Sequence, residues 1–245
     1  MAAETIRVGV AGAHGRLGRI ACAAVSTAPG LTLAAGFVRT LPAGVGDGGP
    51  ALFDDIGAFY AAGLDVVVDC TVYPVSLDVA RRAVAAGVAP VIGATGWTDA
   101  DVTGFAERCE QAGIGALLVP NFSIGAALMM RFAVEAVAFM PHVEIIELHH
   151  DGKRDKPSGT ARLTARRIAE AGGPAAVPIH SVRLPGLVAH QETIFGGTGE
   201  TLTIRHDSNG HTAYAAGIVL AVRNVRAQRG LVKGLDALLF AQRTA

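Results

Sequence analysis

The densest group of potentially reactive side chains lies at residues 147–160, which read Glu-Leu-His-His-Asp-Gly-Lys-Arg-Asp-Lys-Pro-Ser-Gly-Thr. His149 and His150 can act as general acids or bases, and the ammonium of Lys153 can donate a proton. Adjacent residues of a strand face opposite sides, so the two histidines should have different roles. Ser158 is a typical N-cap residue, and the start of a helix there could bind a carboxylate. The alternative is a polar surface loop with a hydrogen-bonded histidine pair.

The sequence does not support a metal site or disulfides. The two histidines lack a third ligand at a spacing that is typical of metal sites. Cys22, Cys70 and Cys109 are odd in number and widely separated, with no Cys-x-x-Cys pair. This pattern predicts buried free thiols in a reducing compartment.

A second group is the glycine-rich sequence Gly12-Ala-His-Gly-Arg-Leu-Gly18, which follows an apparent strand at 6–11 and opens a helix. Glycines let the backbone approach a pyrophosphate, whose charge is met by N–H groups at the helix N-terminus. A tight turn with close helix packing would use the same residues. The position at the start of a βαβ series favours dinucleotide binding.

The end of the second predicted strand bears on the choice of cofactor. Many such folds place an acidic residue here to bind the adenine ribose of NAD. This chain reads Gly36-Phe-Val-Arg39 and offers no acid. Arg39 could pair with a 2′-phosphate through its planar guanidinium, which favours NADPH over NADH, or it could be a solvated surface residue.

The elements that must position these groups fall into two series. The first half alternates short apolar strands with helices at 17–25 and 77–86, which is typical of a parallel sheet covered by helices. Its strands are predicted at 6–11, 31–38, 64–71, 89–93 and 115–119.

The pattern changes after Pro120, where a second domain is predicted to begin. The segment 215–242 returns to helical sequence that could pack on the first domain. Between them the strands imply an open mixed sheet. The predicted elements are a helix at 123–140, a strand at 142–149, a helix at 158–171 with Ser158 as N-cap, and strands at 181–187, 188–195 and 200–206.

Composition indicates an α/β protein and argues against nucleic acid as a partner. Of 245 residues 51% are hydrophobic but only 5% aromatic, so thin layers of aliphatic side chains must form the core. Lys plus Arg and Asp plus Glu number 21 each, which leaves no net field for a polyanion. Residues 1–5 lack export-signal features, and apolar runs are far shorter than the ~20 residues of a membrane span. We expect a cytoplasmic protein outside the membrane.

Five motifs resemble, in order and over nearly the whole chain, those of dihydrodipicolinate reductase, the 4-hydroxy-tetrahydrodipicolinate reductase family of the bacterial lysine and diaminopimelate pathway. They are the glycine-rich sequence at 12–18, Gly-Ala-Thr-Gly at 93–96, Pro-Asn-Phe-Ser-Ile-Gly at 120–125, the reactive sequence at 147–160, and Gly-Glu-Thr-Leu-Thr-Ile-Arg-His at 199–206.

The resemblance implies a Rossmann-type parallel-sheet domain for NADPH or NADH, formed by residues 1–121 and 215–245. Residues 122–214 would form an α+β domain with an open mixed sheet, which binds a cyclic imine dicarboxylate and supplies the interfaces of a homotetramer. Closure of the domains about the Pro120 region would exclude water from the reaction.

The resemblance also assigns residues to the reaction. His149 would be the acid or base, and Lys153 would protonate the nitrogen of the imine as hydride reaches the ring. Substrate contacts would be His150, Ser158, Gly159, Thr160, Thr95 and His211. Cofactor contacts would be Gly12, Ala13, His14, Gly15, Arg16, Leu17, Arg39, Gly93, Ala94, Thr95, Val119, Pro120, Asn121 and Phe122, with no metal.

Three positions depart from the family pattern. Lys156 replaces an Ala, and Ala94 replaces the first Thr of Gly-Thr-Thr-Gly. His211 aligns with an Arg near the substrate carboxylates, and a histidine cannot grip both oxygens of a carboxylate. Three hypotheses follow: the lysine-pathway reductase, a paralogue acting on another cyclic imine or oxo acid, and a non-catalytic dinucleotide sensor. A sensor would have no reason to keep His149 and Lys153 together.

Overall fold

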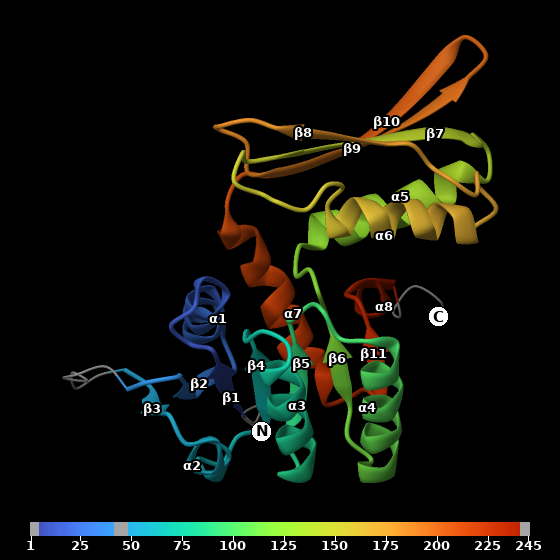
Figure 1. The fold of residues 1–245 in the computed structure, drawn as a ribbon. Helices are drawn as coiled ribbons and strands as arrows, with labels where there is room; N and C mark the ends of the chain where they lie inside the picture. The colour runs from blue at the N-terminus through green and yellow to red at the C-terminus, as the bar shows by residue number, and fades with distance from the viewer. Residues whose placement is uncertain (1–4, 42–48, 241–245) are drawn as a thin grey trace. The chain divides into compact units, whose positions relative to one another are not determined.

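A computed structural model describes residues 5–41 and 49–240, which form two compact units (Figure 1). Unit 1 contains the described residues up to Phe122 and from Tyr214 onward, and unit 2 contains residues 123–213. The expected domains, 1–121 with 215–245 and 122–214, have junctions one residue away from these. In the described part of the chain, no helix combines the length and the apolar character that a membrane span requires.

Unit 1 is built on a sheet of seven strands in the order β11-β6-β5-β4-β1-β2-β3, and neighbouring strands are parallel. Its central strands are short and apolar on both sides, as in β4, where every residue is buried. The strands are β1 (Ile6–Ala11), β2 (Leu31–Phe37), β3 (Ala51–Phe53), β4 (Val66–Asp69), β5 (Ala89–Ile92), β6 (Ala116–Leu118) and β11 (Leu231–Lys233).

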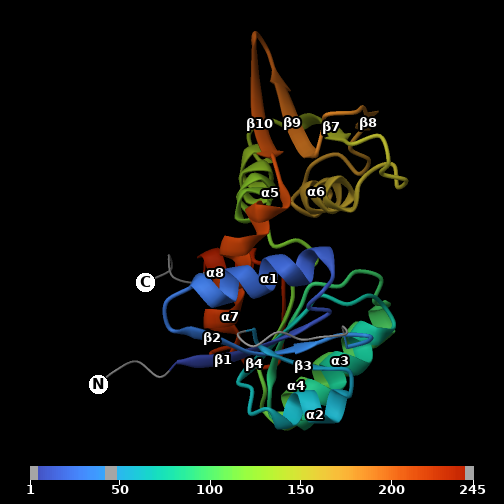
Figure 2. The ribbon, with the colours of Figure 1, turned by 90° about the vertical axis from the view of Figure 1, so that its left-hand side faces the viewer.

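Helices cover this sheet on both faces (Figures 1 and 2). On one face α1 packs against α7, and on the other α3 packs against α4. The buried stripe of α1 includes Ala21, Ala24 and Val25, small residues that let the helix lie close to its neighbours. The helices are α1 (Arg16–Thr27), α2 (Ile56–Ala61), α3 (Val75–Ala85), α4 (Asp99–Ala112), α7 (Ala215–Val225) and α8 (Asp236–Phe240).

The prediction of continuous helical sequence over 215–242 is wrong within its described part. After α7 the chain forms β11, which extends the sheet by pairing with β6, and α8 follows. Gly230 and Gly234, both with positive φ, flank this strand and break the helical pattern. Backbone pairing with β6 stabilises a three-residue strand that side-chain periodicity does not reveal. Residues 241–242 lie outside the described residues.

Unit 2 is a four-stranded mixed sheet in the order β10-β9-β7-β8, with two helices on one face (Figures 1 and 2). β7 pairs parallel with β8 and antiparallel with β9, which in turn pairs antiparallel with β10. A core that includes Ile145, Ile168 and Phe195 lies between sheet and helices. The elements are α5 (Ile124–Val137), β7 (His142–His149), α6 (Gly159–Glu170), β8 (Ile179–Arg183), β9 (Ala189–Gly197), β10 (Glu200–Ser208) and the 3-10 helix η1 (His211–Tyr214).

The predicted fold class, a Rossmann-type parallel sheet with a second open mixed sheet, is confirmed. The strand predicted at 142–149 has the bounds of β7. The strand predicted at 181–187 ends early because residues 184–187 form a turn, with Gly186 at φ 88°. Sequence periodicity missed the short elements β3 and α2, as well as the polar helix α4.

Candidate active site

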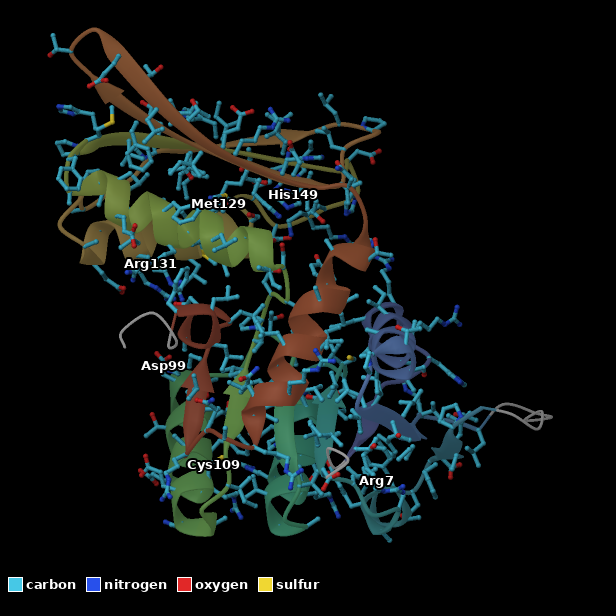
Figure 3. All side chains as sticks on the ribbon, turned by 180° about the vertical axis from the view of Figure 1, so that it is seen from behind. Arg7, Asp99, Cys109, Met129, Arg131 and His149 are labelled. Carbon is cyan, nitrogen blue, oxygen red and sulfur yellow. The ribbon has the colours of Figure 1, made fainter. Side chains whose placement is uncertain are left out.

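Strand β7 carries His149 on the side of the sheet that the helices cover. Alternate residues of the strand, Val143, Ile145 and Glu147, are buried on that side. His149 comes two residues after Glu147 and points the same way, with its side chain 13% exposed (Figure 3). His150 lies beyond the strand and is exposed. The two histidines therefore occupy different environments.

Both carboxylate oxygens of the buried Glu147 accept hydrogen bonds. Nδ1 of His149 lies 2.5 Å from Oε2, and the backbone N–H of Ser158 donates to Oε1 over 3.3 Å. Arg183 of β8 donates through both terminal nitrogens, 2.8 Å to Oε2 and 2.7 Å to Oε1. Burial alone would raise the pKa of Glu147, but hydrogen bonds, led by that from Arg183, lower it below its ordinary value. The carboxylate is therefore ionised at neutral pH.

Burial also lowers the pKa of His149 below its ordinary value, against the hydrogen bond to Glu147, which raises it. The positive charges of Lys153 and Arg183 lower it further. His149 is therefore largely neutral at pH 7. An ionised carboxylate can only accept, so Nδ1 of His149 carries the ring proton and Nε2 keeps a free lone pair.

The loop between β7 and α6 holds Lys153, whose Nζ donates to Oδ1 of Asp155 over 2.7 Å. Both side chains are partly exposed, 23% for the lysine and 46% for the aspartate, so this ion pair is weak and open to exchange. The loop backbone is fixed by Arg183, which donates to the carbonyl oxygens of Lys153 (3.3 Å) and Asp155 (2.7 Å). The backbone of Lys153 is thus held in place, while its ammonium group can exchange Asp155 for another partner.

The loop ends at α6, where Ser158 is the N-cap, as predicted. Its side-chain oxygen accepts from the N–H of Ala161 over 3.1 Å, and its side chain is buried. The next residue, Gly159, has open space where a Cβ would lie. Thr160 follows in the first turn of the helix. This arrangement leaves room for an anionic group at the positive end of the helix.

The glycine-rich sequence of unit 1 is a tight turn between β1 and α1. Gly12 has φ +75°, and its N–H donates to the carbonyl oxygen of Phe37. A Cβ on Gly18 would lie 2.0 Å from the carbonyl oxygen of Gly12, so only glycine fits there. Gly15, the N-cap of α1, provides no side-chain cap, and the first turn holds no acid. The helix start is therefore suited to a pyrophosphate.

Three of the predicted cofactor segments meet at the carboxyl ends of β5 and β6. A Cβ on Gly93 would lie 2.7 Å from the Phe122 ring and 3.2 Å from both the Leu17 side chain and the carbonyl oxygen of Asp69. Ala94, Val119 and Phe122 are buried. The absence of a side chain at Gly93 thus permits the close packing that shapes this end of the sheet.

Asp69, at the end of β4, is a residue that sequence reasoning missed. Burial raises its pKa, against the hydrogen bonds that favour the charged form. Oδ1 accepts from the N–H and the hydroxyl of Thr71, while Oδ2 is buried without a hydrogen-bond partner. An acid that ends a buried strand at this edge of a parallel sheet is the signal that could have identified it.

The remaining predicted residues differ in their exposure. In unit 1, His14, Arg16, Arg39 and Thr95 are exposed, as is Pro120 at the end of β6, while Ala13 is buried and Asn121 half-buried. His211 is exposed in η1. Lys156 is also exposed. Sequence reasoning did not identify Glu147 or Arg183 as site residues.

The three cysteines are free thiols. Cys109 is fully buried, whereas Cys22 and Cys70 are half-buried. Burial raises the pKa of Cys109 to about 11. The prediction of buried thiols is therefore correct for one and too strong for two.

Comparison with known proteins places both units in one family. The family model described as dihydrodipicolinate reductase, N-terminus, matches residues 6–122, and that described as dihydrodipicolinate reductase, C-terminus, matches residues 125–239. Proteins named 4-hydroxy-tetrahydrodipicolinate reductase are similar over almost the whole chain. That of Synechococcus elongatus is 41% identical, covering 97% of this chain and 100% of its own length. That of Geobacillus thermodenitrificans is 43% identical, covering 96% and 99%.

Solved structures agree. A dipicolinate-bound dihydrodipicolinate reductase from Paenisporosarcina sp. TG-14 has a TM-score of 0.85 and 35% identity, covering 95% of this chain and 98% of its own. A scyllo-inositol dehydrogenase from Lactobacillus casei, solved with NAD(H) and scyllo-inositol, has a TM-score of 0.67 at 14% identity, which shows a shared fold alone.

Proposed function

Since this chain belongs to the dihydrodipicolinate reductase family and is a pyridine-nucleotide oxidoreductase, we propose that it reduces 4-hydroxy-tetrahydrodipicolinate with the residues described above. The reaction serves lysine and diaminopimelate biosynthesis. In balance, the substrate, NAD(P)H and a proton give tetrahydrodipicolinate, NAD(P)⁺ and water. The bound cofactor supplies the hydride. The 4-hydroxyl group of the substrate leaves with a ring proton as the water. The ring nitrogen gains electron density as hydride arrives at the ring carbon and must receive the proton.

Lys153 is the proton donor to that nitrogen. Its exposed ion pair with Asp155 can be exchanged for substrate at little cost, since such pairs contribute ~1 kcal/mol or less. His149 is the neighbouring acid or base. Its Nε2 is free to accept a proton at neutral pH and, once protonated, to return it.

The start of α6 binds a carboxylate of the substrate. Ser158 fixes the first turn, and the space beside Gly159 lets the ligand approach the backbone N–H groups of Gly159 and Thr160. His150, Thr95 and His211 are further substrate contacts. A histidine at position 211 provides one hydrogen bond to a carboxylate rather than the paired bonds of an arginine.

The cofactor binds to unit 1. The uncapped start of α1, with Gly12 to Leu17, holds the pyrophosphate, while Gly93, Ala94, Thr95 and the segment 119–122 line the nicotinamide side. Arg39, which is exposed just after β2, pairs with a 2′-phosphate and so favours NADPH.

The active form is a homotetramer assembled through unit 2. The two helices of unit 2, α5 and α6, both lie on one face of its sheet (Figures 1 and 2). On the other face Ile146, Leu148 and Ile194 are only half-buried. Phe139, at the end of α5, is 88% exposed. Exposed apolar surface of this kind marks subunit contacts. The free thiols and the biosynthetic role of the relatives support a cytoplasmic location.

The observation that supports this function most is the group around Glu147, where an imidazole, a lysine-bearing loop and a helix start share one hydrogen-bonded framework. The test is to mix the protein with NADPH and enzymatically generated 4-hydroxy-tetrahydrodipicolinate and to follow the loss of dihydronicotinamide absorbance. Turnover is expected. Cofactor binding without turnover would contradict the proposal and indicate either a paralogue for another cyclic imine or a sensor. Turnover of another cyclic imine would identify the paralogue.

A further inference from the structure

One buried ion pair joins every catalytic part of unit 2. Glu147 lies on β7 and has no exposed surface, and the side chain of Arg183, on β8, is only 5% exposed. Around this pair lie His149, the loop that bears Lys153, and the start of α6 at Ser158, each linked to it by a hydrogen bond. None of these elements is adjacent to Arg183 in the sequence.

We infer that Glu147 and Arg183 are positioning residues, which set the proton-bearing nitrogen of His149 and hold the Lys153 loop in place. Neither touches substrate in this account. The inference rests on the proposed roles of His149 and Lys153, and it adds the residues that hold those two groups in position.

The tautomer of His149 follows from its contact with Glu147. A neutral imidazole carries its proton on Nδ1 or on Nε2, and its hydrogen-bond partner decides which. Glu147 is ionised and can only accept, so it holds the proton on Nδ1. Nε2 is thereby kept as an acceptor toward the reaction. Without a carboxylate at position 147, nothing in this group would enforce that choice.

Glu147 remains ionised although it is buried, because Arg183 compensates its charge. Arg183 satisfies both oxygens through paired donors, the geometry that only a planar guanidinium provides. The same guanidinium reaches the carbonyl oxygens of Lys153 and Asp155. Loss of its planar donors would therefore raise the pKa of Glu147 and also release the loop that bears Lys153.

A purely structural role is the competing explanation, and the energetics of buried ion pairs argue against it. Removing two charges from water costs about as much as their attraction returns, so apolar residues commonly stabilise a core as well or better. A buried Glu–Arg pair that also bonds to an imidazole and two loop carbonyls is better explained by the geometry it imposes.

The chain offers a matched control on the same strand. Glu144 of β7 also pairs with a histidine, Nε2 of His180, at 2.8 Å. Both of these side chains are more than half exposed. Glu144→Gln therefore makes the same chemical change in an exposed carboxylate–histidine pair away from His149 and Lys153. Because Glu144 lies opposite Ile194 on the face proposed for subunit contacts, gel filtration first establishes that this variant keeps the oligomeric state of the parent protein.

The experiment compares Glu147→Gln with Glu144→Gln in the full-length protein. The amide at position 147 can donate toward Nδ1, which moves the ring proton to Nε2. We expect kcat to fall by about 10²- to 10⁴-fold, because the same change in a serine-protease triad costs about 10⁴ through the wrong tautomer. KM should change less than threefold, and Glu144→Gln should match the parent protein in both constants.

The tautomer itself is read by two-bond ¹H–¹⁵N NMR correlation of His149. The parent protein should carry the proton on Nδ1, and Glu147→Gln should carry it on Nε2. A parent protein protonated on Nε2, or a Glu147→Gln variant that keeps the Nδ1 proton and a near-normal kcat, would overturn the inference. The parent spectrum alone shows which ring nitrogen of His149 carries the proton, even if the variant fails to fold.

Arg183→Lys tests the loop, because it keeps the charge and loses the paired donors. We expect kcat to fall by about 10- to 100-fold, whereas Arg166→Lys, in an exposed pair with Glu170 on α6, should have little effect. A normal kcat in Arg183→Lys would refute the positioning of Lys153. The NMR measurement needs no turnover, so it tests the inference even if the chosen substrate is wrong. A parent protein that turns over the substrate but carries the His149 proton on Nε2 would refute the inference and leave the proposed function intact.

Discussion

Replacing Gly18 by alanine should damage the cofactor turn, and the structure gives the size of the effect. The added Cβ would lie 2.0 Å from the carbonyl oxygen of Gly12 and 2.9 Å from Cα of Ala13. Ordinary contacts begin at 3.4 Å, so the carbonyl would have to move by 1.4 Å, the difference between 3.4 and 2.0. The obstructing atoms belong to the backbone and cannot rotate away.

Two terms then compete in the stability of the variant. Alanine in a helix is favoured over glycine by about 1 kcal/mol. Forcing an extra carbon into packed surroundings costs about 1–3 kcal/mol or more. We therefore expect Gly18→Ala to lower the free energy of unfolding by up to about 2 kcal/mol. NADPH should bind at least tenfold more weakly, because the turn that we propose binds the pyrophosphate is displaced.

Gly104→Ala is the matched control, since this glycine also lies in a helix of unit 1 but has open space where its Cβ would go. It should stabilise unit 1 by about 1 kcal/mol and leave NADPH affinity unchanged. The only tryptophan of the chain, Trp97, packs against Phe105 in unit 1, so its fluorescence in urea follows that unit. NADPH affinity is measured by titration of cofactor fluorescence. If both variants gained stability and bound NADPH equally well, the reasoning about Gly18 would be wrong.

Three further outcomes are expected. Lys153→Ala should lower kcat by orders of magnitude while NADPH affinity stays within about twofold, because the ammonium is proposed to act on the substrate; a parallel collapse of affinity in the same titration would contradict this role. Burial lowers the pKa of His149 and His206, so the unfolded chain takes up protons first as the pH falls. The stability of unit 2 should therefore fall as the pH drops below ~6.5 and through the lowered pKa values of the folded state. Because Trp97 reports on unit 1, amide hydrogen exchange of β7 in urea is the measurement, and an unchanged midpoint between pH 7 and pH 5 would contradict this expectation. Arg39→Ala should weaken NADPH binding without changing that of NADH, and equal losses for both cofactors would remove the 2′-phosphate contact.

The sequence predicted those features that depend on local pattern. The strand at 142–149 and the cap at Ser158 follow from side-chain alternation and N-cap chemistry, and the structure has both. The glycine spacing predicted the turn between β1 and α1. Local patterns also located His149 and Lys153 on a strand end and its following loop.

The features that it did not predict depend on pairing between distant residues. β11 exists because backbone groups of 231–233 pair with β6, and its three residues carry no periodicity of their own. Arg183 reaches Glu147 because β7 and β8 pair in parallel, with Leu148 opposite Val182 and His149 opposite Arg183. Nothing near Arg183 in the sequence signals this partner. Glu147 could have been identified, since it lies two residues before His149 on the same strand face.

The central claim is that this chain transfers a hydride from nicotinamide to the substrate ring, and deuterium labelling tests it most directly. The protein is incubated with 4-hydroxy-tetrahydrodipicolinate and NADPH that carries deuterium at the transferring position of C4, and the product is analysed by mass spectrometry. Tetrahydrodipicolinate with one deuterium on a ring carbon is the expected result. Unlabelled product, or bound cofactor that stays reduced with no product, would contradict the claim.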